Sequence, residues 1–158
     1  MLFAAKAALA SLPNININAV IIILATVFFG WRALYSVAVY IALEGIVFGG
    51  NGYMLWWFGY LYTWPLFVAV CMAFRRNDSA LIWAVIAAVF GLVFGPLMYL
   101  EYFAILGGWH NFFAMWVAGI PYDLTHCVGN FAFTLVLYKP LYRVMDAILN
   151  KKRSGSNP

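Results

Sequence analysis

Residues 80–100 read ALIWAVIAAVFGLVFGPLMYL, a run with no charged side chain. A helix needs about 20 mostly apolar residues to cross a hydrocarbon core of about 30 Å. This stretch is therefore long enough to span a membrane, and it predicts that the chain is an all-α integral membrane protein.

Similar stretches lie on both sides of this run. No charged residue stands between Lys6 and Arg32, only Glu44 between Arg32 and Arg75, and none between Asp123 and Lys139. The stretches are continuous instead of alternating between apolar and polar residues, which argues against a β-barrel. Together they are long enough for five or six helical crossings.

The composition of the whole chain agrees with a membrane protein. Of its 158 residues, 66% are hydrophobic and 9% are charged, against about 25% charged in ordinary globular proteins. These values exclude a soluble enzyme, a disordered chain and a disulfide-stapled secreted domain. Aromatic residues make up 20%, more than two interfacial belts require.

Short polar or glycine-rich breaks divide the chain into six predicted transmembrane helices. We expect them at residues 1–11, 16–29, 33–48, 53–74, 80–106 and 121–149, with a separate amphipathic stretch at 109–119. Pro121 would stand in the first turn of the sixth helix, where proline is tolerated. This predicts one membrane domain, residues 1–149, and a polar cytoplasmic tail, residues 150–158.

The first predicted helix is short. About 11 residues span about 16 Å at 1.5 Å per residue, less than the hydrocarbon core. The helix is then tucked against its neighbours, or the chain starts further upstream. A signal peptide is a third interpretation of this segment.

Positive charge predicts the orientation. Lys and Arg follow the positive-inside rule if both termini are cytoplasmic. The turns then assigned to the outside contain no Lys or Arg: 12–16, 49–53 and 107–120. Basic residues are at or near the turns and ends assigned to the inside: Arg32, Arg75, Arg76, Lys139, Arg143 and 151–153.

Several polar residues fall within the predicted spans, where an ionisable group costs about 2.5–3.5 kcal/mol or more. Asp123, His126 and Asn130 share one helical face because they stand at i, i+3 and i+7. Glu44 and Glu101 lie about one turn from the outer ends of their helices. All five belong to the outer half of the membrane, which predicts a pocket open to the outside.

Aromatic residues concentrate at the same depth. Residues 53–64 read YMLWWFGYLYTW, in which Trp57, Tyr60 and Trp64 share a face. Rings together with a few carboxylates suit a flat, nitrogen-bearing organic ligand. Asn14 and Asn16, in the first outer turn, could add amides to such a pocket.

Enzyme motifs are missing from the sequence. It has no G-x-x-x-x-G-K-[ST] phosphate-binding loop, and no Ser stands near His126 to form a nucleophile–base pair. His126 also has no second His or Cys at metal-ligand spacing. We therefore expect a ligand-binding protein with no ATPase of its own, and no metal, cofactor or nucleic-acid partner.

Two alternatives remain open. One is a small intramembrane enzyme or sensor in which a carboxylate such as Glu44 acts as a general base on a lipid or peptide. The other is an accessory or structural subunit whose polar residues only hold its helices together.

Three segments resemble the substrate-binding S components of energy-coupling factor (ECF) transporters, a family of ABC-type importers. They are residues 12–15 (LPNI), 119–131 (GIPYDLTHCVGNF) and 139–141 (KPL). The size and six-helix layout of the whole chain are similar as well.

The resemblance implies a function and partners. S components bind a vitamin or related micronutrient near the outer face, in a pocket built from the first outer loop and helices four to six. Among such ligands, the acidic groups and rings of this chain favour a neutral or cationic heterocycle such as thiamine or a pyrimidine precursor. Flavins and cobalamin-like molecules stay open. They deliver it by docking onto a membrane-spanning T component that is driven by two cytoplasmic ATPases. Small residues at A-x-x-x-A spacing on helix one form part of the docking face, and here Ala4 and Ala8 have that spacing.

Overall fold

The computed structural model describes residues 2–4, 17–48, 54–106 and 108–154, and within these ranges every regular element is helical. A short piece of helix covers residues 2–4. The longer elements are α2 (Asn18–Phe29), the 3-10 turn η1 (Gly30–Arg32), α3 (Ala33–Phe48), α4 (Met54–Ala73), α5 (Ala80–Leu106) and α6 (Trp109–Ser154). The predicted all-α class is confirmed. Most of the first predicted helix falls outside the described residues. That the chain has six transmembrane helices therefore stays a prediction.

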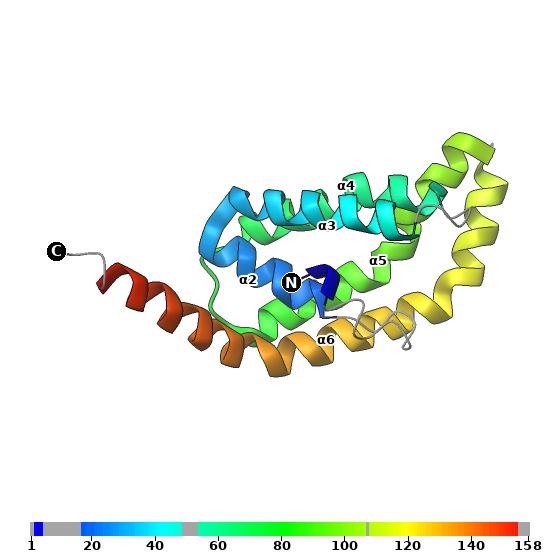
Figure 1. Cartoon of the computed structure of the whole chain (residues 1–158). Coiled ribbons are helices and arrows are strands. Elements are labelled where there is room, and N and C mark those ends of the chain that lie inside the picture. The colour runs from blue at the N-terminus through cyan, green and yellow to red at the C-terminus, as the bar shows by residue number, and fades with distance from the viewer. Residues whose placement is uncertain (1, 5–16, 49–53, 107, 155–158) are drawn as a thin grey trace.

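Two apolar segments of the described chain are long enough to cross a membrane. They are residues 18–47, with mean hydropathy 1.9, and residues 80–105, with mean hydropathy 2.4. The first segment comprises α2 and α3, which are separated by η1. Figure 1 shows the chain reversing direction there, at the left of the view.

The last helix differs from the prediction. Residues 109–119 are not a separate stretch, because α6 runs unbroken from Trp109 to Ser154 with Pro121 in its interior. An interior proline removes one backbone hydrogen bond and kinks a helix, and the yellow part of α6 is bent in Figure 1. The helix continues past the kink because it packs against α5. It also extends beyond residue 149, into the segment predicted to be a polar tail.

The turn between α2 and α3 depends on Gly30. Its φ is +63°, a left-handed conformation that glycine adopts without strain. The side chain of Arg75, from the turn between α4 and α5, covers this glycine, and its Nε donates a hydrogen bond of 3.1 Å to the carbonyl of Val27. Arg32 and Arg75, from two different turns, therefore lie at the same end of the helices.

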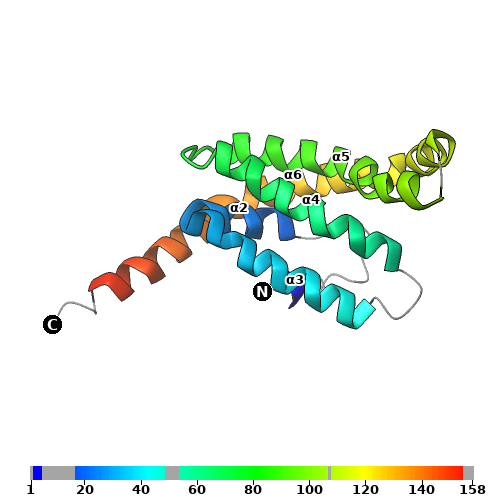
Figure 2. The same ribbon diagram turned by 90° about the horizontal axis from the view of Figure 1, so that it is seen from above.

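The helices pack in a definite order. α5 lies along α6, α4 packs against α5, and α3 packs against α4. Figure 2 shows α4 between α3 on one side and α5 on the other, while the red end of α6 extends away from the other helices. α2 contacts α3, α4, α5 and α6, and its inward residues are almost fully buried. The predicted site residues on α3 to α6 are thereby brought into one interior.

The described part of the chain has an apolar exterior, and its mainly apolar interior also contains several polar side chains. Large apolar side chains cover the outside, with Ile46 78% exposed and Val128 67% exposed. The buried polar or charged residues are Asn18, Thr26, Glu44, Thr63, Glu101, Asp123, His126, Asn130 and Thr134. Extensive exposed apolar surface is unfavourable in water and suits contact with lipid.

Candidate functional site

An aromatic cluster fills the interior between α3, α4 and α5. Trp64 lies at its centre, with ring centroids 5.5–5.8 Å from those of its four neighbours. We use the name aromatic cluster for these five residues: Tyr40, Tyr60, Trp64, Phe90 and Phe94. Several of the ring pairs are edge-on, a favoured geometry for aromatic side chains.

Helical spacing builds this cluster. Tyr60 and Trp64 are four residues apart on α4, and Phe90 and Phe94 are four apart on α5. Residues at i and i+4 lie on one face of a helix, so each helix contributes one stripe of rings. Tyr60 and Trp64, two of the three residues predicted to share a face of α4, are both buried in the interior.

His126 joins the aromatic cluster from α6. Its ring lies 4.8 Å from that of Phe94 in an edge-on arrangement, and 4% of its surface is exposed. The polar residues of α6 therefore meet the aromatic residues of α4 through α5. The structure thus brings both predicted groups of residues against α5.

Asp123 and Asn130 flank His126 and bond to the backbone of α5. Asp123 Oδ1 accepts a hydrogen bond of 3.1 Å from the backbone N–H of Gly95. Asn130 Nδ2 donates one of 3.1 Å to the carbonyl of Ala87. Both side chains thus stabilise the contact between α5 and α6.

Small residues on α5 make this close contact possible. A Cβ atom at Gly91 would lie only 2.8 Å from the backbone nitrogen of Cys127, and one at Gly95 would collide with the Asp123 carboxylate. Gly91 and Gly95 form a G-x-x-x-G pattern, which is typical of close helix contacts in membranes. Our sequence reasoning missed this pattern, and it also missed Tyr40, Phe90 and Phe94.

Some buried polar atoms of this region form no hydrogen bond within the described part of the chain. They are Trp64 Nε1, Asn130 Oδ1 and Asp123 Oδ2. Buried polar atoms are nearly always hydrogen-bonded in folded proteins. One donor in the aromatic cluster and two acceptors on α6 are therefore unmatched among the described residues, and a bound molecule with polar edges could match them.

The predicted carboxylates Glu44 and Glu101 are both buried. Glu44 is fully buried on α3, one helical turn beyond Tyr40 of the aromatic cluster. Glu101 is 6% exposed and faces α4, where a Cβ on Gly59 would lie 3.4 Å from its Oε2. Both side chains thus point into the protein from α3 and α5.

Other predicted residues have different positions. Trp57 ties α4 to α3, since its Nε1 donates a hydrogen bond of 2.7 Å to the carbonyl of Ile41, and it lies outside the aromatic cluster. Ala4 is exposed. Asn14, Asn16 and Ala8 lie outside the described residues.

Within the described ranges, no three His, Cys, Asp or Glu side chains gather where they could hold a metal ion. Comparison with protein-family models, with curated proteins and with solved structures found no match to this chain. Fold and site together define an all-helical protein with two segments long enough to cross a membrane. Its interior combines aromatic and polar side chains.

Proposed function

We propose that the chain is the substrate-capture subunit, or S component, of an ECF-type importer. In this proposal it binds a small heterocyclic micronutrient between α3, α4, α5 and α6. It then delivers the molecule by docking onto a T component driven by two ATPases. The chain itself acts as a binding protein and not as an enzyme.

One observation carries this proposal: the interior of the described chain contains both an aromatic cluster and buried polar atoms that have no hydrogen bond among the described residues. Trp64 packs against four other rings and has an indole N–H with no acceptor among the described residues, while Asn130 Oδ1 has no donor among them. Buried polar groups without partners are unfavourable in a protein that only needs to be stable. A ligand that stacks on the rings and bonds to these atoms would remove that cost.

The chemistry of the interior favours a neutral or cationic ligand. Glu44, Glu101 and Asp123 are buried on three different helices, and carboxylates close to a ligand would repel a multiply anionic molecule. Stacked rings favour a flat heterocycle, and rings also attract cationic groups. Thiamine or a pyrimidine precursor fits this description.

The proposal includes a multi-pass arrangement in the cell membrane with six transmembrane helices and cytoplasmic termini. Arg32 and Arg75 lie in two turns at the same end of the helices, and this grouping of basic residues supports cytoplasmic termini. The exposed position of Ala4 is compatible with a docking role for the N-terminal segment. The apolar exterior supports contact with lipid on several helices.

A second candidate function has its own support. The hydrogen bonds of Asp123 and Asn130 to the α5 backbone are those expected of an accessory subunit whose polar residues hold helices together. This candidate explains the two bonded atoms. It leaves Trp64 Nε1 without a role.

Ligand binding by Trp64 is tested with the purified chain and a panel of vitamins that starts with thiamine, using thermal shift and Trp quenching. We expect one compound to bind, and Trp64→Phe to weaken it about fivefold, because one neutral hydrogen bond contributes about 1 kcal/mol. Trp109→Phe is the matched control, since Trp109 is 59% exposed. A panel without any binder, or equal affinity in Trp64→Phe and the parent, contradicts the proposal.

A further inference from the structure

The last part of α6, residues 139–154, extends beyond the other helices, and we use the name C-terminal arm for it. Its first turn lies beside the end of α2, because the ring centroids of Phe28 and Tyr142 are 4.9 Å apart. Pro140 is inside the helix at this point, and an interior proline kinks a helix. Figure 2 shows the red end of α6 leaving the other helices at an oblique angle.

The length of α6 requires that part of it lies outside the hydrocarbon core of a membrane. Its 46 residues follow a path of about 69 Å at 1.5 Å per residue, more than twice the core thickness of about 30 Å. Lys139 is the first charged residue after Asp123. The contact with Phe28 places the start of the C-terminal arm near η1, which contains Arg32. The arm is therefore the part of α6 that leaves the core, at the basic end of the helices.

Apolar and polar side chains occupy opposite faces of the C-terminal arm. Four apolar residues share one face at spacings i, i+3, i+4 and i+7: Leu141, Val144, Met145 and Ile148. Four polar residues share the other face at spacings i, i+4, i+7 and i+11: Lys139, Arg143, Asp146 and Asn150. The arm is therefore an amphipathic helix.

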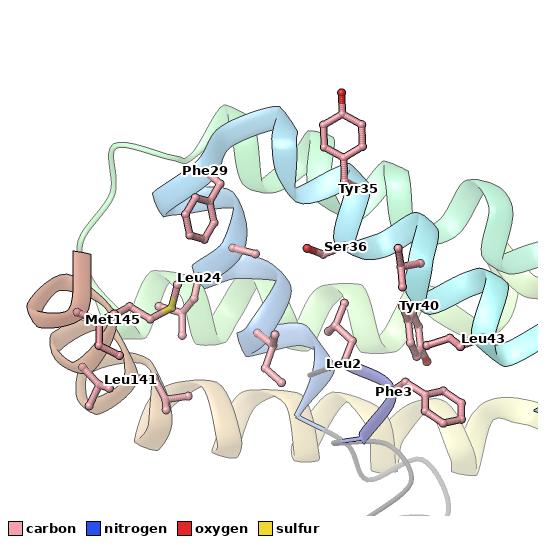
Figure 3. A pocket seen from close by; sticks show the side chains of 15 residues that line it. Leu2, Phe3, Leu24, Phe29, Tyr35, Ser36, Tyr40, Leu43, Leu141 and Met145 are labelled. Atoms are coloured by element: carbon pink, nitrogen blue, oxygen red, sulfur yellow. The ribbon is translucent and has the colours of Figure 1, made fainter. Parts of the chain in front are cut away.

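The apolar face of the C-terminal arm is open to its surroundings. Val144 is 55% exposed and Ile148 is 54% exposed. Both line an apolar cleft of about 590 Å³ that the arm forms with α2 and α3. Figure 3 shows Leu141 and Met145 of the arm on one side of this cleft and Tyr35 of α3 on the other. The apolar face thus continues into the exposed apolar surface of the neighbouring helices, which suits contact with lipid.

The C-terminal arm also carries an excess of positive charge. Residues 139–153 contain five basic residues and one acidic residue, Asp146. Basic segments next to a transmembrane helix are attracted to the anionic lipids of the cytoplasmic leaflet. An amphipathic helix with Lys and Arg on its polar face lies in the interface of such a membrane, with its apolar face at the boundary between headgroups and acyl chains.

We propose that the C-terminal arm lies on an anionic membrane leaflet as an interfacial helix. Its apolar face enters the lipid, and its polar face remains in the headgroup region, where the long stems of Lys139 and Arg143 let their charges reach lipid phosphates. A partner helix fits this face less well, because helices that associate in membranes usually meet through small residues. The inference rests on the proposed membrane location and is independent of the proposed vitamin ligand.

Spin labels on the two faces of the C-terminal arm test this inference. The full chain, without Cys71 and Cys127, would carry a nitroxide at Ile148→Cys or at Asn150→Cys in nanodiscs that contain phosphatidylglycerol. Both positions are exposed and lie on opposite faces. Collisions with oxygen, which concentrates in lipid, should dominate at position 148, and collisions with a water-soluble nickel complex at position 150. In nanodiscs of phosphatidylcholine alone, position 148 should become more accessible to the nickel complex.

A charge variant tests the anionic part of the inference. In the chain labelled at position 148, Arg143→Gln should lower the ratio of lipid-exposed to water-exposed label about fivefold, the usual effect of one basic residue near an anionic surface. Higher salt should shift the ratio in the same direction. Arg76→Gln is the matched control, since Arg76 is exposed but lies in the turn after α4.

Three results would overturn the inference. Equal access of the nickel complex to positions 148 and 150 would show that the C-terminal arm stands in water. A label at position 148 that neither reagent reaches would show that a partner protein or a second copy covers the apolar face. Equal ratios in Arg143→Gln and Arg76→Gln would show that the arm does not select anionic lipid. These results leave the proposed vitamin ligand untouched, whereas a chain that does not enter nanodiscs contradicts both proposals.

Discussion

Asn130 has two different roles at its two polar atoms. Its amide nitrogen bonds to the carbonyl of Ala87 on the neighbouring helix, while its amide oxygen forms no hydrogen bond within the described part of the chain. Thr134 follows one turn later on α6, is fully buried, and has a hydroxyl that likewise forms no hydrogen bond among the described residues. Of these two neighbours, only Asn130 links α6 to α5 through a hydrogen bond.

Replacing these two residues should therefore have opposite effects on stability. Asn130→Ala should lower the free energy of unfolding by about 1 kcal/mol, the usual range for an interhelical hydrogen bond in a membrane. Thr134→Val should be neutral or slightly stabilising, because it removes a buried hydroxyl that has no partner. Unfolding of both variants in detergent micelles measures the difference. A loss in Thr134→Val as large as that in Asn130→Ala would contradict this account.

At the scale of elements, the contact between α5 and α6 is the most extensive in the molecule. It is close because Gly91 and Gly95 present no side chain toward α6. The backbone approach brings Asp123 and Asn130 within hydrogen-bond distance of α5. It also brings His126 against Phe94 of the aromatic cluster. The small residues thus position both the structural and the proposed ligand-binding atoms.

A methyl group at Gly91 should push the two helices apart. Gly91→Ala should cost about 1–3 kcal/mol, the usual range for overpacking, because backbone atoms of His126 and Cys127 lie 2.8 Å from the added Cβ. Gly129→Ala is the matched control on α6, where nothing lies within 4 Å of an added Cβ. Helix propensity should make that control neutral or up to about 1 kcal/mol more stable. Thermal unfolding of the two variants compares them directly, and equal midpoints would show that the helices are not in close contact.

At the scale of the whole molecule, the exterior is apolar and the two turns carrying Arg32 and Arg75 lie at one end. The turn between α5 and α6, where α5 ends at Leu106 and α6 begins at Trp109, is at the other end of α5. These features support the proposed orientation, in which the basic end faces the cytoplasm. The two ends of α5 would then lie on opposite sides of the membrane.

Cysteine labelling tests this orientation. In a background without Cys71 and Cys127, a membrane-impermeant maleimide should label His110→Cys in intact cells. It should label Asp78→Cys only after the membrane is permeabilised, since both positions are exposed but flank opposite ends of α5. The reverse pattern would invert the orientation, and labelling of both positions from one side would show that α5 does not cross the membrane.

The elements were largely predictable because their limits are local. Gly30 ends α2 and the charged turn after Ala73 ends α4, as expected from residue types alone. The course of α6 was not predictable in this way. Pro121 normally favours a helix start, but packing against α5 keeps the helix continuous through it.

The sequence by itself determined that the chain is helical and contains apolar segments long enough to cross a membrane. It could do so because hydropathy and helix breaks are properties of neighbouring residues. It also indicated that Asp123, His126 and Asn130 share a face, because helical periodicity is regular. Only the tertiary structure decided what that face contacts. The contact of α6 with Gly91 and Gly95 and the rings that Tyr40 and Phe94 add to the aromatic cluster both depend on packing between helices distant in sequence.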